Sequence, residues 1–164
     1  MKKNIFLSII AICIPFLIYS QGKNLPNINV KTLDGKSINF SSIENEESPI
    51  VISFWATWCK PCKKELNAIA EVYEEWQEDT GVKLIAVSVD DSRTSPKVRP
   101  YVNSSDWEYE VYLDSNRELA RALGVSSVPH TFLVDKNKKI VWDHRGYVDG
   151  DEEELLEKIE DLID

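Results

Sequence analysis

Two cysteines separated by two residues, Cys59 and Cys62, are the side chains of this 164-residue chain best suited to do chemistry. Two intervening residues bring the sulfur atoms close enough to form a disulfide, so an attack by one thiolate on a partner's disulfide can be resolved by the second thiol. Lys60 stands next to Cys59, and a neighbouring cation lowers the pKa of a thiol from its free value of about 8.5. We therefore expect a redox-active disulfide with Cys59 as the nucleophile and Cys62 as the resolving thiol.

The flanking sequence predicts that a strand ends and a helix begins at these cysteines. Residues 49–55 form an apolar run that suits a buried strand. After the motif, apolar residues recur at helical spacing at Leu66, Ile69, Tyr73 and Trp76. Pro61 suits the first turn of a helix, where its missing N–H costs nothing. Cys59 would then lie where unpaired N–H groups and the helix dipole stabilise an anion.

Two other interpretations of the cysteine pair are weaker. A zinc site usually needs a second Cys or His pair at ligand spacing, and the two histidines of the chain, His130 and His144, do not form one. A purely structural disulfide would close a very small loop and would constrain the unfolded chain little. Redox chemistry is therefore the favoured interpretation, with no metal site predicted.

The string over residues 54–65, FWATWCKPCKKE, resembles the active site of the thioredoxin superfamily, in particular that of the TlpA-like exported thioredoxins. This group includes the thiol-disulfide reductases of cytochrome c maturation, and the similarity extends from about residue 26 to the C-terminus. It implies an α/β thioredoxin fold, with a central mixed β-sheet flanked by helices. An N-terminal β-hairpin and an inserted strand-helix segment over residues 90–123 are also implied. The implied activity is that of a thiol-disulfide oxidoreductase, mainly a reductase of protein disulfides, without a cofactor.

The resemblance also assigns roles to residues near the cysteines. Pro129 corresponds to the cis-proline that faces the two cysteines, where the backbone of Val128 would meet an incoming substrate chain. A simple bend at the start of a strand is the alternative for Pro129. The residues expected to contact substrate are Trp58, Lys60, Pro61, Val128 and His130.

Two titratable residues have open roles. Thioredoxin carries a buried aspartate six residues before its first active-site cysteine, and Ser53 takes that place here. Glu65 corresponds to the acid of the cytochrome-maturation reductases. Near the disulfide it would accept a proton from Cys62 or oppose formation of a second negative charge, and the alternative is a position on a solvated helix face. His130 stands where the family more often has threonine, and it either tunes the thiolate near neutral pH or is an ordinary strand histidine.

The N-terminus has the pattern of an export signal. Lys2 and Lys3 precede an apolar run over residues 5–19, which is shorter than the ~20 residues that span a bilayer. We expect cleavage after Ser20, with an uncleaved membrane anchor as the alternative, and a single thioredoxin-like domain over residues 21–164. The protein is therefore expected in the periplasm, soluble or tethered to the inner membrane. A disulfide there stays oxidised unless it is reduced, so we expect a membrane thiol-transfer protein as electron donor.

Composition supports one globular domain and excludes some partners. Hydrophobic residues make up 43% of the chain, and its length suits one core, expected as a monomer. The net charge of -9 argues against nucleic acid, whose phosphates require a basic surface. An acidic cluster over residues 149–154 lacks the alternating ligands of a calcium loop and suits the first turn of a helix.

Local patterns predict the remaining elements. Strands over residues 28–30 and 37–40 flank the turn Asp34-Gly35, and a buried strand is expected over residues 82–89. A strand over 109–113 precedes a helix over 116–123 that Ser115 would cap. Strands over 131–135 and 140–142 form a hairpin. The last helix, residues 151–163, would place these residues in the core: Leu155, Leu156, Ile159, Leu162 and Ile163.

Two alternative functions belong to other classes. A thiol peroxidase is considered because peroxiredoxins share the inserted segment, but their reactive cysteine follows a threonine with two residues between, whereas one residue separates Thr57 from Cys59. A copper-binding carrier would use Cys59, Cys62 and a histidine, because soft thiolates favour Cu(I).

Overall fold

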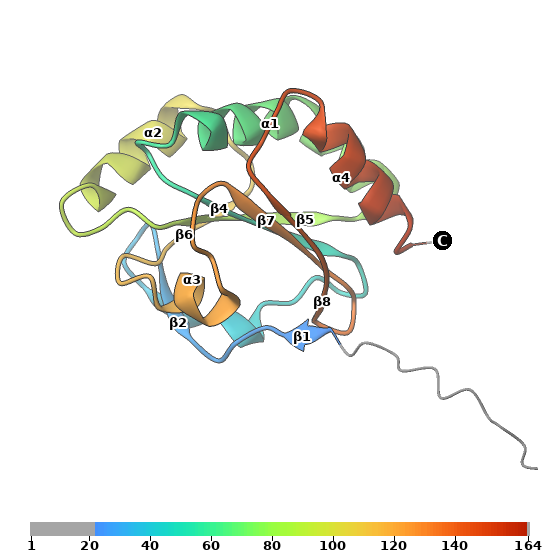
Figure 1. Cartoon of the computed structure of the whole chain (residues 1–164), viewed down its shortest axis with the longest axis horizontal. Coiled ribbons are helices and arrows are strands. Elements are labelled where there is room, and N and C mark those ends of the chain that lie inside the picture. Colours follow the sequence, from blue (N-terminus) through green and yellow to red (C-terminus); the bar gives the residue numbers. More distant parts are fainter. Residues whose placement is uncertain (1–21, 164) are drawn as a thin grey trace, which may run out of the picture.

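A computed structural model describes residues 22–163 and shows one mixed eight-stranded sheet with helices on both faces (Figure 1). The strands are β1 (Lys23–Asn24), β2 (Asn29–Thr32), β3 (Ser37–Asn39), β4 (Ile50–Trp55), β5 (Lys83–Ser88), β6 (Glu110–Leu113), β7 (His130–Val134) and β8 (Lys139–Arg145). The helices are α1 (Lys60–Thr80), α2 (Val98–Ser104), α3 (Glu118–Leu123) and α4 (Asp151–Glu160), and short 3-10 helices span Phe40–Ser42 and Ser95–Lys97. This is the thioredoxin fold that the resemblance implies.

The strand order is β1-β8-β7-β4-β5-β6-β2-β3, which places β4 in the interior of the sheet. β4 pairs in parallel with β5 and antiparallel with β7, and all six of its residues are buried. Such a strand needs apolar residues on both faces, which explains why its sequence is apolar apart from Ser53. Figure 1 shows α1, α2 and α4 over one face of the sheet and α3 over the other.

The predicted apolar face of α1 is confirmed, because Leu66, Ile69, Tyr73 and Trp76 are all buried. The helix ends at Gly81, which has a φ of 68° and donates its N–H to the carbonyl of Gln77. A Cβ at Gly81 would also lie 2.6 Å from Oγ of Ser48. Glycine is therefore required here both by the left-handed backbone and by the close approach of the preceding loop.

The N-terminal segments extend the sheet at both edges. β2 and β3 form the predicted hairpin, and β2 also pairs antiparallel with β6. β1 pairs with β8 at the opposite edge, which no local pattern indicates. The inserted segment supplies α2 and β6, and β6 lies parallel to β5. The predicted export signal and its cleavage point after Ser20 lie outside the described residues.

Two helix boundaries differ from the prediction. α3 begins at Glu118 instead of residue 116, its N-cap position is Arg117, and the side chain that binds its first N–H groups is Asp114 instead of Ser115. The carboxylate of Asp114 accepts hydrogen bonds from the backbone N–H groups of Glu118, Leu119 and Ala120. An ionised cap that receives three N–H groups satisfies more of the helix start than a serine hydroxyl does.

The last helix is shorter than predicted. α4 ends at Glu160, and the side chain of Ile163 is 44% exposed, so its assignment to the core was wrong. Leu155 and Ile159 are buried as expected, because they face α1 one turn apart. Within residues 22–163, no helix is both long and apolar enough to cross a membrane.

Candidate active site

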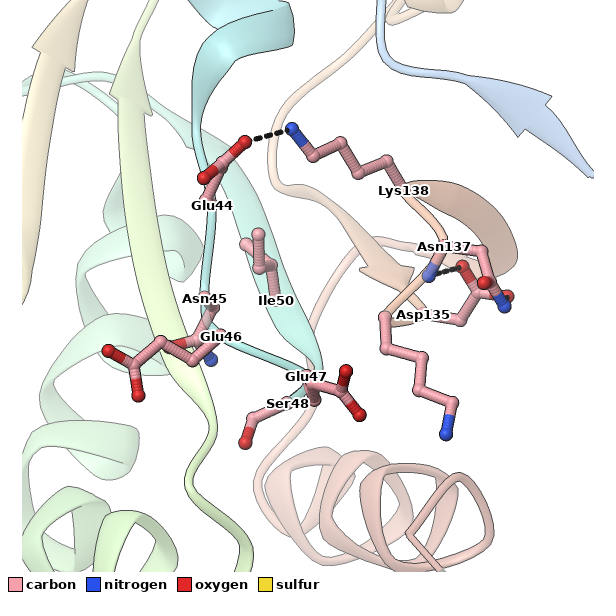
Figure 2. A pocket seen from close by; sticks show the side chains of 10 residues that line it. Glu44, Asn45, Glu46, Glu47, Ser48, Ile50, Asp135, Asn137 and Lys138 are labelled. Carbon is pink, nitrogen blue, oxygen red and sulfur yellow. Dashed lines mark hydrogen bonds and ion pairs between the residues drawn. The ribbon is translucent and has the colours of Figure 1, made fainter.

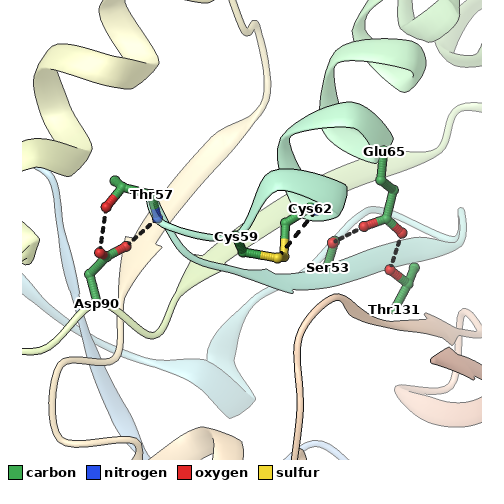
Figure 3. Close-up of a disulfide and its surroundings, with 7 residues drawn as sticks. All are labelled: Ser53, Thr57, Cys59, Cys62, Glu65, Asp90 and Thr131. Carbon is green, nitrogen blue, oxygen red and sulfur yellow. Dashed lines mark hydrogen bonds between the residues drawn. A yellow bond between two sulfur atoms is a disulfide. The ribbon is translucent and has the colours of Figure 1, made fainter. Parts of the chain in front are cut away.

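Cys59 and Cys62 form a disulfide at the start of α1, directly after β4 (Figure 3). Cys59 is the N-cap residue, with φ -86° and ψ 103°, and its Sγ accepts a hydrogen bond from the N–H of Cys62 at 3.3 Å. A sulfur at this position meets the free N–H groups of the first helical turn. Those N–H groups and the helix dipole stabilise a thiolate on Cys59 when the pair is reduced.

The two sulfurs differ in their access to a partner. Cys62 is fully buried, and Cys59 lies nearer the surface. The neighbouring residues Trp58, Lys60 and Pro61 are exposed, and Trp58 is 60% exposed. A large apolar ring in water beside a disulfide offers a contact surface to another protein chain.

The loop that carries Trp58 and Cys59 is fixed by Asp90, which sequence reasoning missed. The Asp90 carboxylate accepts hydrogen bonds from the N–H of Thr57 at 2.8 Å and from its hydroxyl at 2.6 Å (Figure 3). The hydroxyl of Ser88 donates a third hydrogen bond at 2.9 Å. Asp90 follows β5, and the carboxyl ends of the parallel strands β4 and β5 lie side by side. An aspartate two residues after a buried strand was the signal that could have found it.

Replacement of Asp90 by alanine is expected to lower the free energy of unfolding by about 3 kcal/mol, because it leaves buried donors of Thr57 and Ser88 without an acceptor. Disulfide reduction should also slow, since the loop before Cys59 loses its anchor. Urea denaturation and turnover would measure the two effects. The matched variant Asp79→Ala, at an exposed position of α1, should change stability by less than about 0.5 kcal/mol. Equal effects of the two variants would contradict the anchoring role.

Glu65 is buried and does not lie on a solvated helix face. Its side chain is 4% exposed, and it accepts hydrogen bonds from Oγ of Ser53 at 3.1 Å and from Oγ1 of Thr131 at 2.5 Å (Figure 3). Burial raises the pKa of Glu65 to about 7, while the two hydroxyls oppose this shift. Ser53 stands on β4 where thioredoxin has an aspartate. Here the buried carboxyl comes from Glu65 on α1 instead, and Ser53 donates a hydrogen bond to it.

The segment before β7 contains the predicted cis-proline. The peptide bond between Val128 and Pro129 is cis, and the carbonyl of Pro129 accepts a hydrogen bond from the N–H of Gly146 at 3.0 Å. Val128 is half-buried.

His130 is 1% exposed, which speaks against the expected contact with substrate. Its Nε2 lies 2.9 Å from Oδ2 of Asp143, and its Nδ1 is buried without a hydrogen-bond partner. Burial lowers the pKa of His130, although Asp143 acts in the opposite direction. A neutral ring with its Nε2–H donated to Asp143 satisfies this geometry. His144 lies elsewhere, on β8, where its Nε2 is 3.2 Å from Oδ2 of Asp151.

An aromatic group supports the strand side of the site. The ring of Trp55 contacts Trp107 and Tyr101, with ring centroids 4.9 Å and 5.6 Å away. Lys63 Nζ lies 5.3 Å from the centroid of the Tyr101 ring. Trp55 therefore packs in the interior, whereas Trp58 faces solvent.

One cavity in the described part of the chain lies away from the cysteines. It has a volume of about 450 Å³ and is lined by residues 44–48 and by the turn over 135–138, where Lys138 pairs with Glu44 at 2.9 Å (Figure 2). Ile50, the first residue of β4, also lines it, whereas the disulfide follows the last residue of β4. Within residues 22–163, no group of three or more His, Cys, Asp or Glu side chains is placed to hold a metal ion.

Comparisons with known proteins agree with this geometry. Residues 21–143 match the AhpC/TSA family. A thiol-disulfide oxidoreductase ResA of Bacillus cereus (strain ATCC 10987 / NRS 248) is 32% identical over 176 aligned residues, which cover 97% of this chain and 99% of that protein. The solution structure of an uncharacterized thioredoxin-like protein from Porphyromonas gingivalis is 49% identical, with a TM-score of 0.76 over 85% of this chain and 91% of that chain.

A further solved structure, StoA from Bacillus subtilis, is 25% identical with a TM-score of 0.63, and the match covers 80% of this chain and 99% of that chain. The family match covers most of the chain, and the disulfide at the start of α1 supplies the redox group that these relatives' names describe. The chain therefore belongs to the AhpC/TSA family, as a thioredoxin-fold thiol-disulfide oxidoreductase of the TlpA-like group.

Proposed function

We propose that this protein works after export as a reductase of protein disulfides, and that a membrane thiol-transfer protein re-reduces it. The observation that carries the direction is the buried carboxyl of Glu65, which lies one helical turn after the fully buried Cys62. When this carboxyl is ionised, it opposes a second negative charge on Cys62. A neighbour that disfavours the Cys62 thiolate favours the disulfide over the reduced pair, which makes the pair a better electron donor.

The residues divide the reaction between them. The thiolate of Cys59 attacks a substrate disulfide, a mixed disulfide forms, and the first substrate sulfur leaves with the electron pair and takes a proton. Cys62 then gives its proton to Glu65 and attacks Sγ of Cys59. The Cys59–Cys62 bond forms and the second substrate sulfur is released. The substrate gains two electrons and the cysteine pair loses two.

Contacts with the substrate chain are assigned to the surface around Cys59. Trp58, Lys60 and Pro61 are exposed there, and the backbone of Val128 beside Pro129 would meet the substrate as an added strand. Such contacts are largely independent of sequence, which suits a protein that receives unfolded chains. The resemblance to cytochrome c maturation reductases makes apocytochrome c the first client to test.

The redox midpoint of the Cys59–Cys62 pair tests the direction. Tryptophan fluorescence across a series of dithiol buffers should report the equilibrium, because Trp58 and Trp55 flank the disulfide. We expect a midpoint near the value of about -270 mV that thioredoxin has, or below it. A midpoint near about -120 mV would overturn the reductase assignment and favour a disulfide donor. The variant Trp58→Phe serves as a control that separates the signal of the exposed ring from that of Trp55.

A further inference from the structure

The buried carboxyl of Glu65 has polar neighbours on the side of the sheet that carries α4. A narrow cleft between α1, β7, β8 and α4 is lined by the side chains of Glu65, Thr131, His144, Tyr147, Asp151 and Glu152, with apolar residues between them. Its cavity volume is about 10 Å³, which is close to the space that one water molecule requires. No lysine or arginine of the described chain lines this cleft.

The outer part of the cleft contains one hydrogen-bonded pair and one pair of close nitrogen and oxygen atoms. The hydroxyl of Tyr147 donates to Oε2 of Glu152 at 2.7 Å, and Nε2 of His144 lies 3.2 Å from Oδ2 of Asp151. His144, Asp151 and Glu152 are all partly exposed, so this end of the cleft is in contact with solvent. The inner end of the cleft is formed by the carboxyl of Glu65, which is buried.

We propose that the cleft holds one water molecule between Glu65 and the Tyr147–Glu152 pair, and that protons pass between Glu65 and solvent by this route. Glu152 and Asp151 act as positioning residues: their carboxylates place negative charge at the outer end of the cleft and so favour the proton on Glu65. A buried water needs two to four polar partners, which the lining of the cleft supplies. This inference rests on the proposed role of Glu65 as the base for Cys62.

The chemistry of the proposed reaction requires such a route. The pKa of Glu65 is raised to about 7, so at neutral pH about half of the molecules carry a protonated carboxyl. In these molecules Glu65 must lose a proton to solvent before it can take one from Cys62. The titratable groups that face Glu65 are His144 from β8, Tyr147 from the following loop, Asp151 and Glu152 from α4, and Tyr109 from the segment before β6.

The charged neighbours shift the pKa of Glu65 in one direction. Asp151 and Glu152 both raise the pKa of Glu65, as a smaller effect than burial. Tyr109 is buried, its hydroxyl donates to the carbonyl of Leu66, and burial raises its pKa, so it remains neutral at physiological pH. Removal of a carboxylate at the outer end should therefore lower the pKa of Glu65, whereas removal of a similar charge outside the cleft should not.

The experiment compares Glu152→Gln and Asp151→Asn with the matched control Glu154→Gln. All three positions lie in the first turn of α4 and have the same effect on the helix dipole, but Glu154 is exposed and does not line the cleft. Carbon NMR of labelled glutamate in the oxidised protein would follow the Glu65 carboxyl. We expect its pKa to fall by about half a unit in each cleft variant and to stay unchanged in the control.

Two further results decide the proposal. A high-resolution crystal structure should contain one ordered water within hydrogen-bond distance of both Glu65 and the Tyr147–Glu152 pair, and a dry cleft would overturn the route. Equal Glu65 titrations in Glu152→Gln and Glu154→Gln would overturn the positioning role. Both measurements use the oxidised protein and do not depend on the direction of electron flow, so a redox midpoint that contradicts the reductase function would leave them interpretable.

A functional readout links the cleft to catalysis. The rate at which Cys62 resolves a mixed disulfide should rise with pH as Glu65 becomes ionised, and the midpoint of this profile should move down with the pKa of Glu65 in Glu152→Gln. A merely structural role of Glu152 would change the rate at all pH values without moving the midpoint. If the pKa of Glu65 shifts in Glu152→Gln but the midpoint of the pH–rate profile does not, the link between the cleft and Cys62 is contradicted.

Discussion

Replacement of Cys62 by alanine is expected to convert the protein into a trap for its substrates. Cys59 keeps its place at the N-terminus of α1, so it still attacks a substrate disulfide. The mixed disulfide then persists, because the thiol that resolves it is missing. Well-oriented intramolecular reactions have effective molarities of about 10⁵–10⁸ M, and an external thiol at millimolar concentration does not replace that advantage. Turnover should therefore fall by ~10³-fold or more.

Mass spectrometry of covalent adducts on non-reducing gels would identify the trapped chains. Cys59→Ala is the matched control: it should lose turnover to a similar degree but capture nothing, because the remaining Cys62 is fully buried. Equal capture by both variants would show that the nucleophile is assigned to the wrong cysteine. Trapped chains from exported proteins would also identify the clients.

Replacement of Glu65 by glutamine is expected to stabilise the protein above neutral pH. Burial raises the pKa of Glu65 from 4.5 to about 7, so between these two values the folded chain binds more protons than the unfolded chain. Stability therefore falls as pH rises through this window, and the loss is complete above pH 7. At 1.36 kcal/mol per unit of pKa, the loss is about 3 kcal/mol. Glutamine lacks this titration and can still bond with Ser53 and Thr131.

Urea denaturation at pH 5 and pH 8 would measure this difference. The gap in free energy of unfolding between Glu65→Gln and the parent should widen by about 3 kcal/mol from the lower to the higher pH. The control Glu74→Gln changes an exposed carboxyl of the same helix, and its gap should stay within about 0.5 kcal/mol. A constant gap for Glu65→Gln would mean that this carboxyl titrates near its ordinary pKa. In that case Glu65 would not be a base poised near pH 7.

The same substitution should separate stability from activity. Glu65→Gln removes the carboxyl that we propose as the proton acceptor for Cys62, so the resolving step should slow even though the fold becomes more stable above pH 7. A buried carboxyl that costs stability in its ionised form, on the same helix as the reacting thiol, has the pattern expected of a catalytic group, because structural carboxylates are usually paired with a cation or an N–H group. Among the described residues, Glu65 has two hydroxyl donors and no cationic partner.

The features that could be predicted are those that the chain specifies over short distances. The buried strand before Cys59, the helix after it, the apolar face from Leu66 to Trp76 and the hairpin at Asp34-Gly35 all follow from local periodicity and turn residues. The motif of two cysteines at a strand-helix junction is equally local. Its thiol chemistry therefore follows from the residue types and their spacing alone.

The features that could not be predicted depend on which strands become neighbours and which face each residue takes. Glu65 meets Ser53 and Thr131 only because β4 and β7 pair with these two residues opposite each other. Asp90 reaches Thr57 only because β5 lies parallel to β4. Local patterns specify the alternation of residues along each strand, but a shift of one residue in register would reverse their faces.

The sequence by itself determined the reactive pair and its place at a helix N-terminus, because these depend on residues that are close together in the chain, and the resemblance of the motif to a known family implied the fold class. The tertiary structure alone decided that Glu65 is buried, that His130 faces Asp143 and that α4 brings Glu152 to the cleft beside Glu65. Desolvation and charge proximity are properties of the packed molecule, since they require side chains from distant segments to share one interior. The protonation behaviour of this site therefore belongs to the fold, whereas its thiol chemistry belongs to the motif.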